Sequence, residues 1–192
     1  VCLVGSEMCI RDRIYRKYGQ VWCRHKLQPI SASSTLHKTT RCSYSYSKNF
    51  NDQMTPEKMS KLHSTSEANH RIWHAHEFSE LLSLPGVITE FHAHGFAIAR
   101  VVDTEAELLM IVTETIKQNT GLATNCLLNI EKKLSQKGAQ KLTLEVSESN
   151  SAAITIYTKL NYKKIAIRKS YSRDKNGKFE TALVMQKNLR PN

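Results

Sequence analysis

The feature that most constrains the fold is a pair of adjoining strand patterns followed by an amphipathic helix. The segments GFAIARVV (95–102) and AELLMIVT (106–113) are apolar and rich in β-branched residues, and a short polar loop separates them. This arrangement predicts two strands. In the segment GLATNCLLNIEKKLSQKG (121–138), apolar residues recur at steps of four and three, which predicts one buried helix face. The chain therefore combines strands and helices within a single unit.

Shorter patterns on both sides extend this outline. Thr55 can cap a helix that begins at Pro56, and Asn150 can cap another helix further along. Asn176-Gly177 is a strong hairpin signal between the last two strands. The predicted elements are a helix over 54–66, a second amphipathic segment within 76–86 that ends at a Pro85-Gly86 turn, and strands over 95–102 and 106–113. They continue with a helix over 121–138, a strand over 141–146, a helix over 151–160, and strands over 163–172 and 180–188. This order predicts an α/β (α+β) fold, with one domain over 54–192 and a mixed, mostly antiparallel central sheet flanked by helices.

Residues 1–53 do not continue this pattern. They hold nine Lys or Arg against three Asp or Glu, so they carry +6 of the formal net charge of +11, and they contain four of the five cysteines. Their stretch SASSTLHKTTRCSYSYSKNF is Ser/Thr-rich, which indicates disorder. The cysteines show no Cys-x₂-Cys spacing, so no metal or disulfide site is predicted there. We expect the segment to be a non-native leader.

The opening residues indicate the origin of such a leader. EMCIRDR (7–13) can be encoded by GAG ATG TGT ATA AGA GAC AGR, which resembles the transposon mosaic-end adapter of sequencing libraries. We therefore expect 1–13 to be translated adapter, 14–53 to be upstream DNA read through into the gene, and Met54 to be the natural start. The chain has neither a secretory h-region nor a run of about 18 apolar residues, which predicts a soluble cytoplasmic protein.

The segment QNTGLAT (118–124) lies between a predicted strand and a predicted helix. Gly121 leaves room where the backbone must turn and approach a ligand, and Ala123 is the next smallest choice. Free N–H groups at a helix N-terminus suit a pyrophosphate, and no acidic residue of the first turn competes with that anion. On its own, such a glycine is more often a turn or packing residue than part of a ligand site, so the wider context decides.

Several separated blocks resemble the ribosomal-protein-alanine N-acetyltransferase family of the GNAT superfamily, especially its alphaproteobacterial members. These blocks are Gln118-x-x-Gly121-x-Ala123, GFAIARVVDTEAELLMI, LEVSESNSAAITIYTKLNY and a terminal pattern of Arg, Tyr and ETALVM, in the family's order across about Met54 to Leu189. The resemblance implies a GNAT domain with acetyl-coenzyme A as cosubstrate and no metal. The loop lacks the basic residues usual beside the glycine, which implies weaker cofactor affinity.

The resemblance also implies roles for individual residues. Glu145 would be the base that takes a proton from the acceptor amine, and Tyr157 the acid that protonates the coenzyme A thiolate. Asn150 would contact the cofactor, as would Ile111, Val112, Thr113, Gln118, Asn119, Thr120, Gly121, Leu122, Ala123 and Thr124. Ordinary alternatives remain: Glu145 as a solvated strand carboxylate, Tyr157 as a packed aromatic, and Asn150 as a helix cap alone.

The implied activity is acetyl transfer to the N-terminal α-amine of a protein, ribosomal protein S18 with an N-terminal alanine by resemblance. The same chemistry on other protein N-termini, a lysine or a small amine stays open. A basic ribosome-binding or nucleic-acid-binding module without catalysis also stays open, although +6 of the charge lies in 1–53. We expect a monomer without direct contact to membrane or nucleic acid.

Two histidine pairs and one cysteine are predicted to play no chemical part. His74-x-His76 and His92-x-His94 lack the accompanying carboxylate pattern of a zinc site, so no metal ligand is assigned. Cys126 lies within the predicted helix over 121–138, where a small buried side chain is expected.

Overall fold

The computed structural model describes residues 54–66, 72–173 and 179–189. The elements in chain order are α2 (Pro56–Thr65), α3 (Ala75–Leu82), β1 (Val87–His92), β2 (Gly95–Val102), β3 (Glu105–Thr113), the one-turn 3-10 helix η3 (Thr115–Lys117), α4 (Leu122–Gln136), β4 (Lys141–Ser147), α5 (Ser151–Lys159), β5 (Lys163–Arg173) and β6 (Phe179–Asn188). The expected leader over 1–53 and the Asn176-Gly177 hairpin lie outside the described residues.

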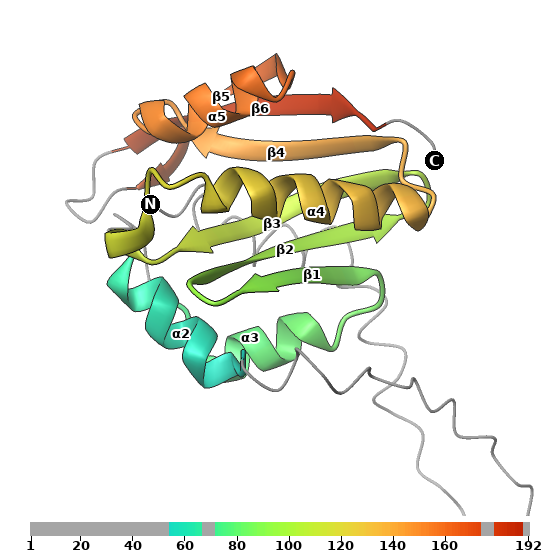
Figure 1. Ribbon diagram of the computed structural model, residues 1–192. Coiled ribbons are helices and arrows are strands. Elements are labelled where there is room, and N and C mark those ends of the chain that lie inside the picture. The colour runs from blue at the N-terminus through green and yellow to red at the C-terminus, as the bar shows by residue number, and fades with distance from the viewer. Residues whose placement is uncertain (1–53, 67–71, 174–178, 190–192) are drawn as a thin grey trace, which may run out of the picture.

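The strands form one six-stranded sheet in the order β1-β2-β3-β4-β6-β5 (Figure 1). Only the β3–β4 pair is parallel, and the other four pairings are antiparallel. The parallel pair is connected through η3 and α4, as a parallel crossover requires. The predicted fold class, a mixed and mostly antiparallel sheet flanked by helices, is confirmed.

Strand β1 is the one described strand that the sequence patterns did not predict. Its six residues are all partly buried, since Val87 and Phe91 pack toward one face of the sheet and Ile88 toward the other. With both faces covered, the strand lacks the apolar–polar alternation by which strands are recognised. The two residues of its turn into β2 are Ala93 and His94, and neither is a usual hairpin residue.

Three predicted helix caps, at Thr55, Asn150 and Gly138, are confirmed by the structure. The second helix ends earlier than its expected range, at Leu82. The Thr55 hydroxyl oxygen accepts a hydrogen bond from the Lys58 N–H at 3.4 Å, and Pro56 opens α2. The Asn150 side chain accepts from the Ala153 N–H at 3.1 Å at the start of α5. Gly138, with φ +89°, follows α4 in the left-handed conformation of a C-terminal cap.

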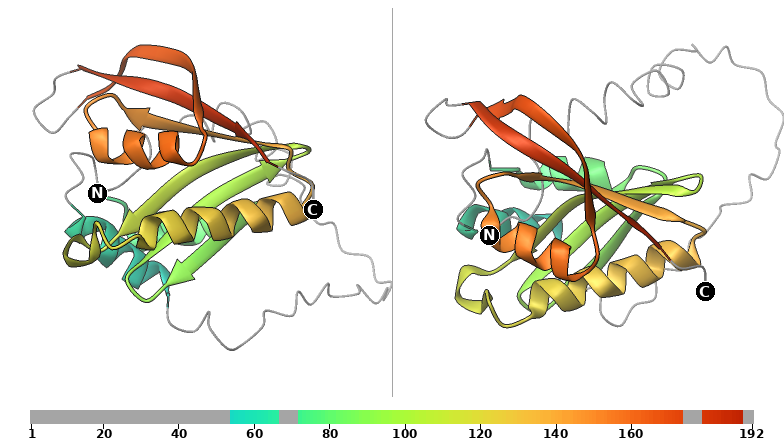
Figure 2. Two further views of the ribbon diagram at one scale, coloured as in Figure 1. Left: turned by 45° about the horizontal axis from the view of Figure 1, so that its top comes forward. Right: turned by 90° about the horizontal axis from the view of Figure 1, so that it is seen from above.

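The helices cover the two faces of the sheet in pairs, with α2 and α3 on one face and α4 and α5 on the other (Figure 2). Under α2 and α3, Phe78 and Phe96 meet edge to face at 5.7 Å within one apolar cluster. Under α4 and α5, a larger cluster includes Leu127, Leu144 and Tyr157. No helix in the described part of the chain is long and apolar enough to cross a membrane.

A buried polar contact joins α4 to β6 and to the residues after α5. Glu131 of α4 is 7% exposed; its Oε1 accepts from the Tyr162 hydroxyl at 2.8 Å and its Oε2 from the Lys187 ammonium at 2.6 Å. The Lys187 ammonium also lies 5.5 Å from the centre of the Tyr162 ring. One carboxylate therefore satisfies two polar groups that the apolar core would otherwise leave without partners.

Candidate active site

Strands β3 and β4 are parallel neighbours for only part of their length. Glu105, Ala106 and Glu107 pair with Lys141, Leu142 and Thr143, and no later pair joins the two strands in the described residues. Both strands continue beyond this point, β3 to Thr113 and β4 to Ser147, and they move apart as they do (Figure 1). In the middle of the sheet, the end of β3 and the end of β4 therefore do not pair with each other.

Ile111, Val112 and Thr113 form the end of β3, beyond the last pair with β4. All three are buried, and their pairing on the other side is with β2. Gly95 is the partner of Thr113, and a Cβ at Gly95 would lie 2.1 Å from the carbonyl oxygen of Val112, so only glycine fits. Core packing and a backbone contact to a ligand are therefore compatible for these residues.

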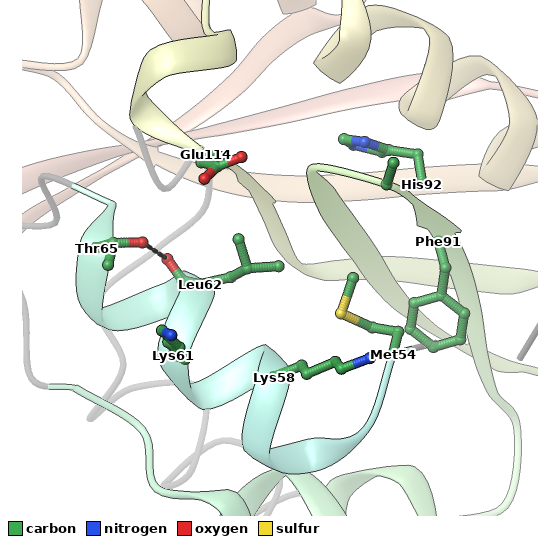
Figure 3. A pocket seen from close by; sticks show the side chains of 9 residues that line it. Met54, Lys58, Lys61, Leu62, Thr65, Phe91, His92 and Glu114 are labelled. Atoms are coloured by element: carbon green, nitrogen blue, oxygen red, sulfur yellow. Dashed lines mark hydrogen bonds between the residues drawn. The ribbon is translucent and has the colours of Figure 1, made fainter. Parts of the chain in front are cut away.

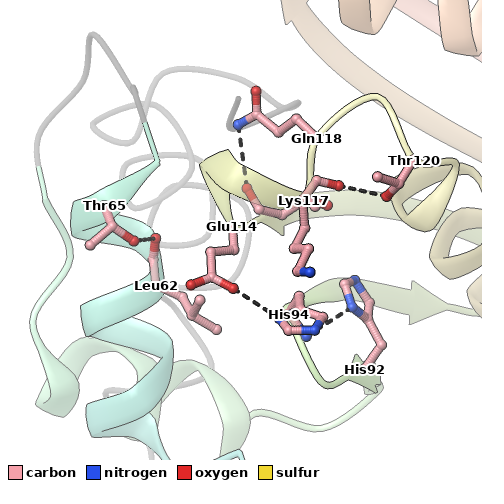
Figure 4. Close-up of polar contacts among 9 residues, drawn as sticks. Leu62, Thr65, His92, His94, Glu114, Lys117, Gln118 and Thr120 are labelled. Atoms are coloured by element: carbon pink, nitrogen blue, oxygen red, sulfur yellow. Dashed lines mark hydrogen bonds and ion pairs between the residues drawn. The ribbon is translucent and has the colours of Figure 1, made fainter.

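The predicted loop runs from the end of η3 into α4. Asn119 (φ +59°) and Gly121 (φ +85°) are both left-handed, and Gly121 caps α4. The Gln118 amide donates to the Thr113 carbonyl at 3.4 Å, and the Thr120 hydroxyl donates to the Lys117 carbonyl at 2.6 Å (Figure 4). The first bond ties the loop to the end of β3, and the second ties it to η3.

The start of α4 has the properties of an anion site. Leu122, Ala123 and Thr124 form its first turn, where the N–H groups point out of the helix, and that turn has no acidic residue. No heavy atom lies within 4 Å of the position that a Cβ would take at Gly121. The space in front of the glycine is open to a ligand.

Glu145 lies on β4 with its side chain opposite the apolar face of the strand, as the alternation in KLTLEV predicts. The residue is only 2% exposed, which excludes a solvated strand carboxylate. Its Oε1 lies 3.2 Å from Nε of Arg168 on β5. No sequence pattern gave Arg168 a role in the site.

Tyr157 lies in α5, on the other face of β4, and Asn150 caps the start of that helix. Tyr157 has no exposed surface, and its ring meets that of Tyr162 edge to face at 5.5 Å. Ile111, Val146 and Tyr157 belong to the same apolar cluster, which brings the ends of β3 and β4 together with α5. Glu145 and Tyr157 therefore lie on opposite faces of the sheet at β4, the strand that separates from β3.

A second group of polar residues lies beside the loop, where the histidine pair His92 and His94 meets Glu114, a partner that the sequence patterns did not indicate. His94 Nδ1 and Glu114 Oε2 are 2.9 Å apart. The backbone N–H of His94 donates to the ring Nδ1 of His92 at 3.2 Å (Figure 4). Burial, and then the neighbouring His94, lower the pKa of His92. No group of three or more His, Cys, Asp or Glu in the described residues could hold a metal ion.

His92 and Glu114 also line a pocket of about 360 Å³ between α2 and the β1–β2 turn (Figure 3). Leu62 and Phe91 supply apolar walls, and Lys58 and Lys61 of α2 line it as well. The pocket combines residues from three separate parts of the chain, so no local sequence signal marks it.

Cys126 is buried in α4, as predicted. Its thiol lies 3.9 Å from the Glu90 carbonyl oxygen. Burial, assisted by the charge of Glu90 and opposed by Lys133, raises the pKa of Cys126 to about 12. The thiol is therefore protonated at neutral pH and is a poor nucleophile.

Comparison with known proteins connects this geometry to a family. A model of the family described as FR47-like protein matches residues 86–172. The [Ribosomal protein bS18]-alanine N-acetyltransferase of Haemophilus influenzae is 40% identical over 91 residues, which cover 47% of this chain and 62% of that relative. The crystal structure of the ribosomal-protein-S18-alanine N-acetyltransferase from Escherichia coli has a TM-score of 0.61 and 26% identity, and the match covers 71% of this chain and 91% of that one.

The chain is thus similar in sequence and in fold to N-acetyltransferases of the GNAT superfamily. The resemblance found in the sequence is thereby confirmed. An aminoglycoside 6′-N-acetyltransferase complexed with coenzyme A shares the GNAT fold at a TM-score of 0.58 and 19% identity, over 71% of this chain and 92% of that one. The chain spans about three fifths of the length of the curated GNAT relative from Haemophilus influenzae.

Proposed function

We propose that the protein transfers the acetyl group of acetyl-coenzyme A to the N-terminal α-amine of a protein. One observation carries the proposal: β3 and β4 separate, and Glu145 and Tyr157 lie on opposite faces of the sheet at β4. A thioester held between the strands could be attacked by an amine from one face and release its thiolate toward the other. Such direct transfer needs no cysteine nucleophile, consistent with the buried Cys126.

The loop and the start of α4 would hold the cofactor. Its pyrophosphate would accept hydrogen bonds from the N–H groups of the first turn, Leu122 to Thr124, supported by Gln118, Asn119 and Thr120. The backbone of Ile111 to Thr113 would bind the acetyl end. Asn150 already caps α5, so its side chain could give the cofactor only part of its hydrogen-bonding capacity.

The chemistry then needs two proton transfers. The neutral amine attacks the thioester carbonyl, Glu145 takes the proton that the new amide loses, and a backbone N–H of β3 stabilises the oxyanion. The C–S bond breaks as Tyr157 donates its hydroxyl proton to the departing thiolate. Glu145 and Tyr157 would return to their starting states by exchanging a proton with solvent.

We propose ribosomal protein S18 with an N-terminal alanine as the acceptor, and a monomer acting in the cytoplasm. The support is the similarity to two enzymes named for that acceptor. The test is acetyl transfer to a panel of peptides: the S18 N-terminus, the same peptide with its α-amine blocked, an unrelated N-terminus, and an internal lysine. Preferred turnover of the unblocked S18 peptide is expected. Preference for the lysine peptide would overturn the acceptor, and no turnover of any peptide would overturn the activity.

Gly121 and Gly138, at the two ends of α4, allow a matched test of the anion site. Both are left-handed, with φ +85° and +89°, and neither has a heavy atom within 4 Å of a Cβ position. Alanine at either position should cost about 1–2 kcal/mol of stability through backbone strain. Only Gly121→Ala should also weaken acetyl-coenzyme A binding, about tenfold, by placing a methyl group before the first-turn N–H groups. Scanning calorimetry measures the stability of the two variants, and titration calorimetry measures their affinity for acetyl-coenzyme A. Equal affinities of the Gly121→Ala and Gly138→Ala variants would contradict an anion site at Gly121.

A further inference from the structure

Arg168 of β5 contacts Glu145, the candidate base on β4, although β6 lies between the two strands. Strand β6 lies between β4 and β5 and pairs Glu145 with Val184 on one side and Arg168 with Ala182 on the other. Because Ala182 and Val184 are two residues apart, Glu145 and Arg168 lie diagonally across β6 on the same face of the sheet. Across β6, Arg168 Nε comes within 3.2 Å of Glu145 Oε1.

The environments of the two partners are unequal. The Glu145 side chain is 3% exposed, whereas that of Arg168 is 48% exposed. A buried carboxylate needs a hydrogen-bonding or charged partner, because burial without one is costly. On the outer side, the guanidinium carbon of Arg168 lies 5.3 Å from the centre of the Tyr171 ring, which limits where the guanidinium can go. The Glu145 carboxylate is therefore held by Arg168 of β5, and the position of Arg168 is itself restricted by its contact with the Tyr171 ring.

We propose that Arg168 is a positioning residue that fixes the orientation of the Glu145 carboxylate for proton transfer. The proposal rests on the proposed function, in which Glu145 is the base. A glutamate side chain turns about three bonds, and proton transfer requires an oxygen within hydrogen-bond reach of the amine. The ion pair at Oε1 fixes the side chain's direction before the acceptor arrives. Arg168 stays protonated throughout, since the proton moves from the amine to the carboxylate.

The experiment compares Arg168→Gln, Arg168→Lys and Arg168→Ala in the full chain, with Lys169→Gln as the matched loss of an exposed positive charge on the same strand. Arg168→Gln should lower kcat about 10–100-fold, because small misplacements of a reacting group have effects of this order. The KM for acetyl-coenzyme A should stay within about twofold, since no interaction with the cofactor is lost. Arg168→Lys should recover part of the rate, and Lys169→Gln should match the wild type.

Chemical rescue separates positioning from a structural role. Half of the Arg168 side chain is exposed, so millimolar guanidinium can reach the space that Arg168→Ala leaves. It should raise kcat of Arg168→Ala several-fold, but not that of Arg168→Ala combined with Glu145→Gln. Thermal unfolding and acetyl-coenzyme A calorimetry on each variant record whether the fold and cofactor site remain.

The outcomes distinguish this proposal from the function on which it rests. Unchanged kcat in Arg168→Gln, with Glu145→Gln inactive, overturns the role of Arg168 and leaves the acetyltransferase standing. A kcat loss matched by lost cofactor affinity, without rescue by guanidinium, also overturns it, because the effect is then structural. A wild-type protein that transfers no acetyl group overturns both.

Discussion

Replacing Glu145 by Gln is expected to lower kcat for acetyl transfer about 10²–10⁴-fold, the usual contribution of a positioned general base. Glutamine has nearly the same shape, and its amide oxygen can still accept a hydrogen bond from Arg168 Nε. The ability to take a proton is what the substitution removes. Initial rates on the S18 peptide, at saturating acetyl-coenzyme A, measure the effect.

The control for this variant is Glu148→Gln, which removes an exposed carboxylate just after β4. Glu148→Gln should keep the wild-type rate, and both variants should bind acetyl-coenzyme A as the wild type does. A Glu145→Gln enzyme that keeps its full rate would show that the amine loses its proton elsewhere, and Glu145 would then be a structural carboxylate.

The second large effect concerns stability. Replacing Glu131 by Ala should reduce the free energy of unfolding by about 3 kcal/mol, because it leaves the Lys187 ammonium and the buried Tyr162 hydroxyl without their shared acceptor. For a domain of this size, such a loss lowers the midpoint of thermal unfolding by about 10 °C. Calorimetric melting of both proteins at pH 7 tests the expectation, and an unchanged midpoint would contradict it.

Tyr162→Phe is the matched control, since it removes one hydroxyl and should cost about 1 kcal/mol at neutral pH. Burial first, then the charge and hydrogen bond of Glu131, raise the pKa of Tyr162. In the unfolded chain this tyrosine ionises near its ordinary pKa of about 10, while in the folded protein it stays neutral. The stabilisation is therefore complete below about pH 10 and is lost as the pH rises further. Tyr162→Phe should remove the part of that alkaline decline that Tyr162 causes.

Local patterns predicted most of the fold because the determinants are close together in the chain. Thr55, Asn150 and Gly138 each act within four residues, and the caps they predict are present. The loop at Gly121 could be predicted in the same way, because its backbone conformation and the lack of acidic residues in the first turn of α4 are local properties. The family resemblance added roles that no spacing could supply, and for Glu145 and Tyr157 these roles stay predictions.

What the sequence did not predict depends on contacts between distant segments. Strand β1 has no alternation because both of its faces are covered, and this depends on helices elsewhere in the chain. The pair between Arg168 and Glu145 requires β6, the last strand, to lie between β4 and β5. The pocket beside Glu114 needs α2 to lie against the β1–β2 turn. The end of α2 is also joined to η3, because the Thr115 hydroxyl donates to the Thr65 carbonyl at 2.8 Å.

The separation of β3 from β4 has a consequence for the order of events in catalysis. If the cofactor lies toward α4 and α5 while the acceptor comes from the face of Glu145, neither blocks the other's path. Either could bind first, and both must be present together before the acetyl group moves. The kinetic mechanism would then be sequential with random order, and at no stage would an acetylated form of the protein exist as an intermediate.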